Sequence, residues 1–238
     1  HLASISGGTD IVSCFVGGNP MLPVYSGEIQ SKCLGVDVDI LDEKGQGTLQ
    51  KGELVCKSPL PSMPIGFWDD LNKEKYIKSY FSKFKNVWTQ GDYAKISKNN
   101  GIVIYGRSDS TLNPGGIRIG TAEIYRSVEQ IDEIAESIVV GQSWNNDTRI
   151  ILFVKLQKDI ELDQVIIDKI KYNIRSSNST RHVPAKIIKV SDIPRTRSGK
   201  IAEITVRDII NGMNIKNLEA LANPACLSEY ENIEELKN

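Results

Sequence analysis

The chain has 238 residues, of which 29 are basic and 30 acidic, giving a formal net charge of −1. This length allows one large domain or two small ones with buried cores, and the balanced charge argues against a dedicated nucleic-acid or membrane-surface binder. The four cysteines are far apart and form no CxxC pair, so reduced thiols are expected rather than a disulfide framework or a zinc site.

Residues 1–107 are predicted to be strand-rich. Val36, Val38 and Ile40 alternate with aspartates, which is the two-residue period of a half-buried strand. Asp69 is a candidate cap for a short helix that runs to Tyr80. Further strands are expected at 53–57, 87–89, 93–96 and 102–105.

From Arg107 onward the character of the sequence changes. Residues 106–120 are rich in Gly, Ser, Asp and Pro, which is typical of linkers and turns. Thr121 can then cap a helix that carries Ile124, Val128 and Ile131 on one face. Beyond it we expect strands at 149–155 and 185–190, a helix at 201–210, and an amphipathic helix marked by Leu162, Val165, Ile166, Ile170 and Ile174. The pattern predicts a small α+β domain.

The composition predicts three parts: the strand-rich residues 1–107, a small α+β domain at 108–212 and a surface tail at 213–238. A short flexible hinge near Arg107 allows the first two parts to rotate, and ligands prefer the clefts between such units. The longest apolar run, Ile150 to Val154, is far shorter than a membrane span, and no signal peptide is visible. A cytoplasmic location is therefore expected.

Two motifs of the first part have the groups that a nucleotide needs. In SISGGTDI (4–11), Thr9 offers a hydroxyl to a phosphate and Asp10 a carboxylate to Mg²⁺. The alternative is an ordinary turn capped by Asp10. In VWTQGDYAKI (87–96), the Asp92 carboxylate can accept both hydroxyls of a ribose. The alternative there is a turn aspartate that accepts from its own backbone.

Two later motifs are cationic. Arg107 and Arg118 flank a Gly-rich segment that opens a helix, which favours either anion binding or a solvated linker. The segment 181–200 gathers Arg181, Lys186, Lys189, Arg195, Arg197 and Lys200. Lys200 follows Gly199 but is not part of a Walker A loop, because Pro194 stands where that motif has its first Gly. Binding of RNA is an alternative, weakened by the absence of aromatic residues that stack on bases.

In their order and spacing, these motifs resemble the adenylate-forming acyl-CoA synthetase superfamily. The resemblance is carried by SISGGTDI (4–11), YFSKFKNVWTQGDY (80–93), YGRSDSTLNPGGIRIGTAEIY (105–125), STRHVP (179–184) and IPRTRSGK (193–200). It implies a fold in which the strand-rich end of a large adenylate-forming domain is joined by a hinge to a small α+β mobile lid domain. It also implies a ligase that converts an acid and ATP to an acyl-adenylate and then transfers the acyl group to coenzyme A.

The resemblance also implies roles for single residues. Lys200 would be catalytic, reaching the reacting carboxylate and the α-phosphate during adenylate formation. The nucleotide would be bound by Thr9, Asp92, Arg107 and Arg118, and Asp10 would hold Mg²⁺. Asp109 would be the hinge, Gly116 would border the coenzyme A channel and Arg175 would contact coenzyme A.

The sequence departs from the superfamily pattern in two ways. Many relatives have an aromatic-Gly-x-Thr-Glu where this chain has Gly7-Gly8-Thr9-Asp10, and the shorter Asp10 leaves the direct magnesium contact open. This spelling suits the branch that uses acetoacetate; acetate, propionate or another short acid is the alternative, as is a non-catalytic RNA- or protein-binding module. The superfamily's phosphate loop is absent, so we expect a carboxy-terminal fragment that lacks the amino-terminal part of the same chain and is inactive by itself.

Overall fold

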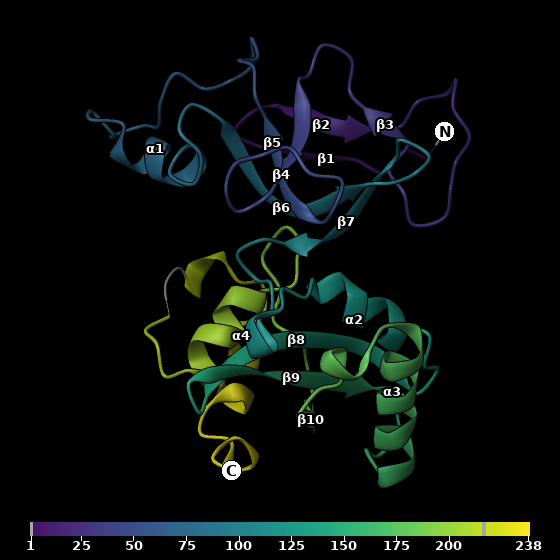
Figure 1. The fold of residues 1–238 in the computed structure, drawn as a ribbon. Coiled ribbons are helices and arrows are strands. Elements are labelled where there is room, and N and C mark those ends of the chain that lie inside the picture. The colour runs from purple at the N-terminus through teal and green to yellow at the C-terminus, as the bar shows by residue number, and fades with distance from the viewer. Residues whose placement is uncertain (1, 216–217) are drawn as a thin grey trace. The chain divides into compact units, whose positions relative to one another are not determined.

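The computed structural model describes residues 2–215 and 218–238. The chain divides into two compact units, His1–Ser108 and Asp109–Asn238, and each unit is described by itself (Figure 1). The predicted domain roles of residues 1–107, 108–212 and 213–238 stay predictions.

The first unit is built on two antiparallel sheets. One has the order β1-β2-β3 and the other the order β4-β5-β6-β7. The strands are β1 (Ser6–Gly8), β2 (Ser13–Gly17), β3 (Ser31–Lys32), β4 (Val38–Leu41), β5 (Gly52–Cys56), β6 (Trp88–Ile96) and β7 (Ile102–Arg107), with one helix, α1 (Glu74–Tyr80). Phe15, Ile40, Leu54 and Trp88 are buried in the core of this unit, and every residue of β5 is buried.

Two local predictions for the first unit are corrected by the structure. The strands expected at 87–89 and 93–96 form one strand, β6, and Asp92 lies inside it rather than in a turn. Gly91 has φ +82, so the glycine produces an irregularity within the strand and not a break. The helix α1 begins at Glu74, and the Asp70 carboxylate, not that of Asp69, accepts from the backbone of Tyr76 at 2.9 Å.

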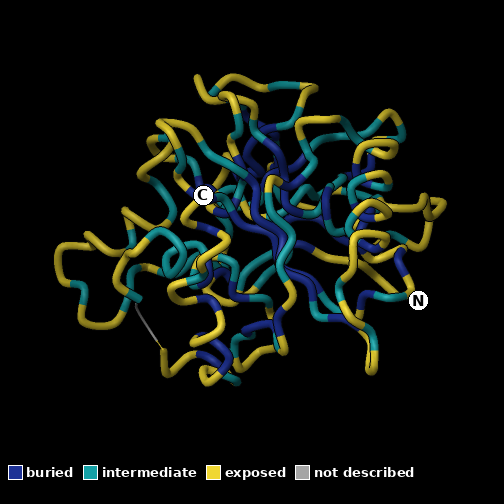
Figure 2. Tube along the Cα trace, turned by 90° about the horizontal axis from the view of Figure 1, so that it is seen from below, coloured by how far each residue is buried: buried dark blue, intermediate teal, exposed yellow. Residues whose placement is uncertain are grey.

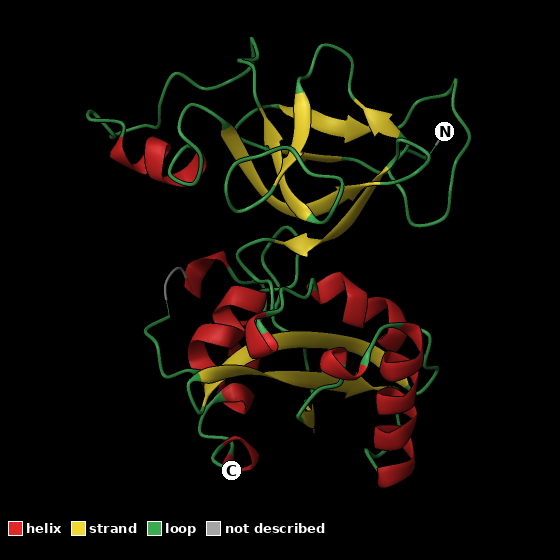
Figure 3. Cartoon of the chain, viewed as in Figure 1, coloured by secondary structure: helices red, strands yellow, loops and turns green. Residues whose placement is uncertain are grey.

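The second unit packs helices on both faces of a three-stranded sheet (Figure 3). The strand order is β10-β9-β8, with β9 antiparallel to β8 and parallel to β10. The elements are α2 (Thr121–Val128), β8 (Ile134–Trp144), β9 (Asp147–Leu156), α3 (Gln164–Ser177), β10 (Lys186–Lys189) and α4 (Glu203–Ile210), with short 3-10 turns at Pro114–Gly116, Thr180–His182, Leu218–Ala220, Pro224–Tyr230 and Glu234–Leu236.

The central strand β9 is buried on both faces. Ile150, Leu152 and Val154 belong to the core that α2 and α3 cover. Ile151 and Phe153 belong to the core on the opposite face, which α4 and the C-terminal turns cover. A strand covered on both faces needs apolar side chains at successive positions, which explains the unbroken apolar run in the sequence.

The segment after residue 212 contributes to that second core. The side chains of Tyr230 and Leu236 are 1% and 6% exposed, in a part of the chain that the sequence suggested would pack on the surface. Figure 2 shows the buried, intermediate and exposed residues along the chain, with many of the exposed ones in the loops that project outward. None of the helices in the described parts of the chain combines the length and apolar composition that a membrane crossing needs.

Candidate functional site

Thr9 and Asp10 occupy the tight turn between β1 and β2, and both are exposed. The turn is closed by a hydrogen bond from the Val12 amide to the Thr9 carbonyl, at 3.2 Å. The Tyr80 hydroxyl donates to the Asp10 carboxylate, and the Tyr80 ring stacks on Trp88 with centroids 3.7 Å apart. The turn is therefore fixed to the core of the first unit while the Thr9 side chain stays accessible to a ligand.

Asp92 lies on β6 with its carboxylate held by two neighbours. The Ser6 hydroxyl donates to Oδ2 at 2.5 Å, and the Arg107 guanidinium lies 3.3 Å from Oδ1. The side chain of Asp92 is only 14% exposed. Desolvation raises the pKa of Asp92, and the contacts with Ser6 and Arg107 act in the opposite direction. The two contacts thus hold the carboxylate in one orientation, while its burial raises its pKa.

Gly91 makes room for the Arg107 side chain. A Cβ at this position would lie 2.4 Å from the Arg107 guanidinium, and φ +82 favours glycine in any case. Arg107 donates to the Gln90 carbonyl at 2.9 Å, while the Gln90 amide donates to the Gly7 carbonyl at 2.6 Å. These contacts bring β1, the middle of β6 and the end of β7 together. Four of the predicted ligand-binding residues are thereby gathered in one region of the first unit: Thr9, Asp10, Asp92 and Arg107.

In the second unit, the Gly-rich segment is an ordered turn rather than an open linker. Leu112 and Ile119 pair as an antiparallel bridge, with the Pro114–Gly116 turn at the tip. The Gly115 amide donates to the Asp147 carboxylate, which fixes the tip against β9. Gly116 has φ +75 and no atom within 4 Å of the position that a Cβ would take. The glycine tip is therefore open to a ligand.

The other predicted residues of the second unit are distributed over several elements. The Asp109 carbonyl accepts from the Arg207 guanidinium of α4 at 2.8 Å. The Arg118 guanidinium donates to the Thr111 hydroxyl at 3.3 Å. Arg175 lies in the last turn of α3 and is exposed. The structure does not bring Arg175 together with Asp109 or Arg118 through any contact that we observe among the described residues.

Lys200 lies at the end of a short hairpin whose backbone is ordered. Arg195 and Ile201 form a bridge, and the Thr196 amide donates to the Lys200 carbonyl at 2.8 Å. Gly199 has φ +84 and forms the turn. The Lys200 side chain is exposed, and within residues 2–215 and 218–238 no hydrogen bond or ion pair holds its ammonium group. A fixed backbone with a free ammonium suits a side chain that acts on a ligand.

The His182 side chain packs between polar neighbours. Its Nδ1 lies 2.9 Å from the Ser179 hydroxyl and its Nε2 lies 3.6 Å from the Glu123 carboxylate. Among the residues that the structure describes, no group of three or more His, Cys, Asp or Glu side chains could hold a metal ion.

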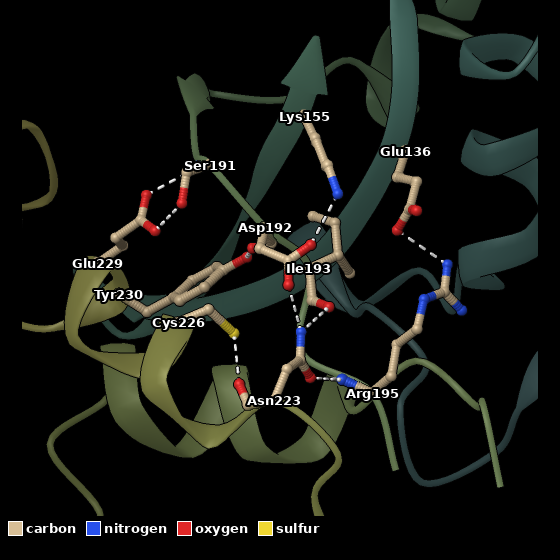
Figure 4. A network of polar contacts seen from close by, with 10 residues as sticks. All are labelled: Glu136, Lys155, Ser191, Asp192, Ile193, Arg195, Asn223, Cys226, Glu229 and Tyr230. Atoms are coloured by element: carbon tan, nitrogen blue, oxygen red, sulfur yellow. Dashed lines mark hydrogen bonds and ion pairs between the residues drawn. The ribbon is translucent and has the colours of Figure 1, made fainter. Parts of the chain in front are cut away.

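Two groups of residues near these sites were missed from the sequence. Glu53 is 1% exposed and accepts from the Ser108 hydroxyl at 2.7 Å and from the Lys83 ammonium. An acid within the otherwise apolar stretch ELVC was the available signal. The second group is the polar network that joins Asp192 and Asn223 beside the Lys200 hairpin (Figure 4). Its partners are far apart in the sequence, so no local pattern could indicate it.

Known proteins match the whole chain. The acetoacetyl-coenzyme A synthetase of Rhizobium meliloti (strain 1021) is 57% identical over 239 residues, covering 100% of this chain and 37% of the relative. The acetoacetyl-CoA synthetase of Xenopus tropicalis is 48% identical over 240 residues, covering 100% of this chain and 36% of the relative. The AMP-binding enzyme C-terminal domain profile matches residues 123–200. Over its whole length, the chain is similar to acetoacetyl-CoA synthetases.

Solved structures agree with this similarity. The acetoacetyl-CoA synthetase from Streptomyces lividans superposes with a TM-score of 0.91 at 41% identity, covering 99% of this chain and 36% of that chain. The anthranilate CoA ligase AuaEII, in complex with anthranoyl-AMP, has a TM-score of 0.76 at 20% identity over 87% of this chain and 39% of that chain, which shows the fold alone. The resemblance and the predicted α+β adenylate-forming fold class are confirmed. The chain spans little more than a third of the length of its family relatives and the residue roles stay predictions.

Proposed function

We propose that this chain is part of a ligase that activates acetoacetate with ATP and transfers the acyl group to coenzyme A. The overall reaction is acetoacetate + ATP + CoA → acetoacetyl-CoA + AMP + diphosphate. The observation that carries the proposal is the 57% identity to an acetoacetyl-CoA synthetase across 100% of the chain. A non-catalytic binding module has no comparable support.

Nucleotide binding is assigned mainly to residues of the first unit. Asp92 accepts hydrogen bonds from the two ribose hydroxyls, which requires the ionised carboxylate that Ser6 and Arg107 favour. The exposed hydroxyl of Thr9 donates to the α-phosphate. Arg107, and Arg118 of the second unit, add cationic donors for the phosphates. Burial and preset contacts keep Asp92 from reorienting when the nucleotide binds.

The proposal includes Mg²⁺, which binds together with ATP. Asp10 presents one exposed carboxylate, and Mg²⁺ is commonly held by one or two carboxylates together with substrate phosphates and water. A single acidic ligand therefore fits this ion, although Asp10 also accepts from Tyr80. The bound ion would neutralise phosphate charge.

Lys200 has the central role in adenylate formation. The acetoacetate carboxylate attacks the α-phosphorus of ATP, a P–O bond forms, and diphosphate leaves with the electrons of the broken P–O bond. Negative charge accumulates on the α-phosphate oxygens, and a nearby ammonium stabilises it. Rotation at the hinge residue Asp109 brings Lys200 to the nucleotide and then withdraws it. The thiol of coenzyme A, passing Gly116 and contacting Arg175, next attacks the acyl carbon and AMP leaves.

The test is Lys200→Ala in the full-length protein. We expect ATP–diphosphate exchange to fall by about 10²–10³-fold, as for the loss of one transition-state donor. Thioester formation from supplied acetoacetyl-adenylate should be largely retained, because Lys200 has by then withdrawn. Lys158→Ala is the matched control, since Lys158 is also an exposed lysine of the second unit. Equal loss of both half-reactions would contradict this division of roles.

The acid substrate requires a separate measurement. Diphosphate release with acetoacetate, acetate and propionate should show the highest kcat/KM for acetoacetate. A preference for acetate or propionate would overturn the assigned substrate and leave the adenylate-forming chemistry in place.

A cytoplasmic location completes the proposal, because the four cysteines are free, and free thiols are usual in a reducing compartment.

A further inference from the structure

The hairpin that carries Lys200 is too small to be rigid by itself. Its internal backbone pairing is short: the Thr196 amide donates to the Lys200 carbonyl at 2.8 Å, the Gly199 amide to the Thr196 carbonyl at 2.8 Å and the Ala202 amide to the Pro194 carbonyl at 2.9 Å, and the Lys200 amide donates to the Thr196 hydroxyl at 3.1 Å. An isolated two-stranded hairpin is at best marginally stable in water. Other parts of the second unit must therefore hold this loop if Lys200 is to be presented in one position.

Residues 220–222 pair with the outer edge of the hairpin through an antiparallel bridge between Leu221 and Thr196. The Arg197 amide donates to the Ala220 carbonyl at 2.9 Å, and the Ala222 amide donates to the Arg195 carbonyl at 2.8 Å. Leu221, opposite Thr196, is 6% exposed and packs with Ala202 and Leu227. The outer edge of the Lys200 hairpin is thus paired with the C-terminal segment.

Asn223 continues this pairing with its side chain. Its amide nitrogen donates to the Asp192 carboxylate at 2.5 Å and to the Ile193 carbonyl at 3.0 Å, and its amide oxygen accepts from the Arg195 backbone at 2.9 Å (Figure 4). One side chain therefore fixes the chain at residues 192, 193 and 195, where it enters the hairpin. Alanine at this position would remove all three contacts at once.

The network around Asn223 is anchored on the sheet. The Lys155 ammonium of β9 lies 2.7 Å from the Asp192 carboxylate. The Tyr230 hydroxyl donates to the Asp192 carbonyl at 2.8 Å, and the Tyr230 ring meets Phe153 edge to face with centroids 4.8 Å apart. Asp192, one of the three partners of Asn223, is therefore fixed to the sheet before the hairpin begins.

A second connection runs from the sheet to the turn beside Lys200. The Arg195 guanidinium lies 2.9 Å from the Glu136 carboxylate of β8 and donates to the Gly199 carbonyl at 2.9 Å. The Arg195 backbone is the group that Asn223 holds. A shift at Asn223 is thereby transmitted through Arg195 to the peptide next to Lys200.

We propose that Asn223 is a positioning residue for Lys200, and that the C-terminal segment 218–230 is a brace for the catalytic hairpin. The inference rests on the proposed role of Lys200. It assigns to this segment a part in adenylate formation and none in thioester formation, because only the first half-reaction requires the Lys200 ammonium in place. Misplacing a catalytic group by about 1 Å costs on the order of a hundredfold in rate.

The test is Asn223→Ala in the full-length protein, with both half-reactions measured. We expect ATP–diphosphate exchange to fall by about tenfold to a hundredfold in kcat, with little change in the KM for ATP. Thioester formation from supplied adenylate should be retained. Ser228→Ala is the matched control: it removes an exposed polar group of the same segment whose hydrogen bond is to the Ala225 carbonyl and does not reach the hairpin. Tyr230→Phe removes one contact to Asp192 while keeping the ring, so it should show a smaller loss of the same kind.

The double variant Asn223→Ala/Lys200→Ala separates positioning from general damage. If Asn223 acts through Lys200, its substitution should cost nothing more in exchange rate once Lys200 is absent. An additive loss, or equal losses in both half-reactions, overturns the inference. If Asn223→Ala fails to fold, an unchanged exchange rate in Tyr230→Phe overturns it instead. If Lys200→Ala alone leaves exchange intact, the proposed function has failed rather than the brace.

Discussion

At the scale of single residues, Asp92 illustrates the conflict between binding and burial. A carboxylate that accepts two ribose hydroxyls must be ionised, whereas desolvation raises its pKa. Folding therefore makes Asp92 bind its proton more tightly than the unfolded chain does. The group favours the folded state at acidic pH and loses that contribution as the pH rises through its folded pKa. Nucleotide binding has the opposite dependence, since it needs the charge.

Ser6→Ala tests this balance. Ser6 donates to Asp92 at 2.5 Å and lowers its pKa, so removing the hydroxyl should raise the pKa further. As the pH falls, the variant should lose its affinity for AMP at a higher pH than the unchanged protein does. At a pH well above this transition, the two proteins should bind AMP equally well. Calorimetric titrations across the acidic range measure this shift, with Ser4→Ala, an exposed serine near the same strand, as the control. A curve displaced to lower pH would contradict the assigned role of Ser6.

The sequence identified Thr9, Asp92 and Lys200 as candidates because each lies in a local motif. It could not identify Ser6 as a partner of Asp92, since the two residues are 86 positions apart and meet only through the sheets. Asn223 was equally invisible, because its three contacts reach back across 28 to 31 positions. Local patterns predict which groups carry chemistry, whereas tertiary contacts determine what holds them.

At the scale of elements, α3 shows how far periodicity predicts burial. Ile166, Ile170 and Ile174 recur every four residues and are buried as expected. Val165, which the sequence placed on the same face, is 74% exposed. Its position lies about one hundred degrees from that of Ile166 around the helix. Hydrophobicity alone could not distinguish the two neighbours.

Two β-branched residues of α3 provide a matched pair. Ile170→Ala removes a fully buried side chain and should reduce the free energy of unfolding of the second unit by about 2–5 kcal/mol. Val165→Ala should change it by less than about 0.5 kcal/mol, because the side chain is largely in water. Urea denaturation followed by circular dichroism measures both. Similar losses for the two variants would show that α3 packs in a different rotation.

The strand β8 was missed, although it is the longest strand among the residues that the structure describes. Its sequence IAESIVVGQSW mixes buried apolar residues with Ser137 and Gln142, which are also buried, so no clear alternation appears. The Gln142 side chain donates to the Leu236 carbonyl and accepts from Arg149. Buried polar residues whose hydrogen-bond partners are distant in the sequence interrupt the hydrophobic pattern, so that pattern does not reveal the strand.

At the scale of the whole molecule, each unit has a core of its own. Ile11, Phe15 and Trp88 belong to a cluster made only of residues from the first unit. The sheet of the second unit is covered on both faces by residues of the second unit. A unit that buries its own core should fold by itself.

We therefore expect residues 109–238, expressed alone, to unfold in one cooperative thermal transition. The same unit cut at residue 212 lacks the buried side chains Leu227, Tyr230 and Leu236. Fully burying one large apolar side chain contributes about 1.5–3 kcal/mol, and small domains have only about 5–15 kcal/mol in total. The shorter fragment should lose most of its stability, and hydrogen exchange of β9 amides should accelerate.

The comparison of the two fragments decides what the end of the chain does. If residues 213–238 are a tail that merely lies on the surface, 109–212 and 109–238 should melt at the same temperature with equal amide protection. If the segment completes the second core, only 109–238 should protect β9, whose Ile151 and Phe153 lie in the same cluster as Tyr230. If residues 109–212 fold and only the amides of 193–201 lose protection, segment 213–238 acts as a brace for the Lys200 hairpin but does not contribute to the stability of the second core.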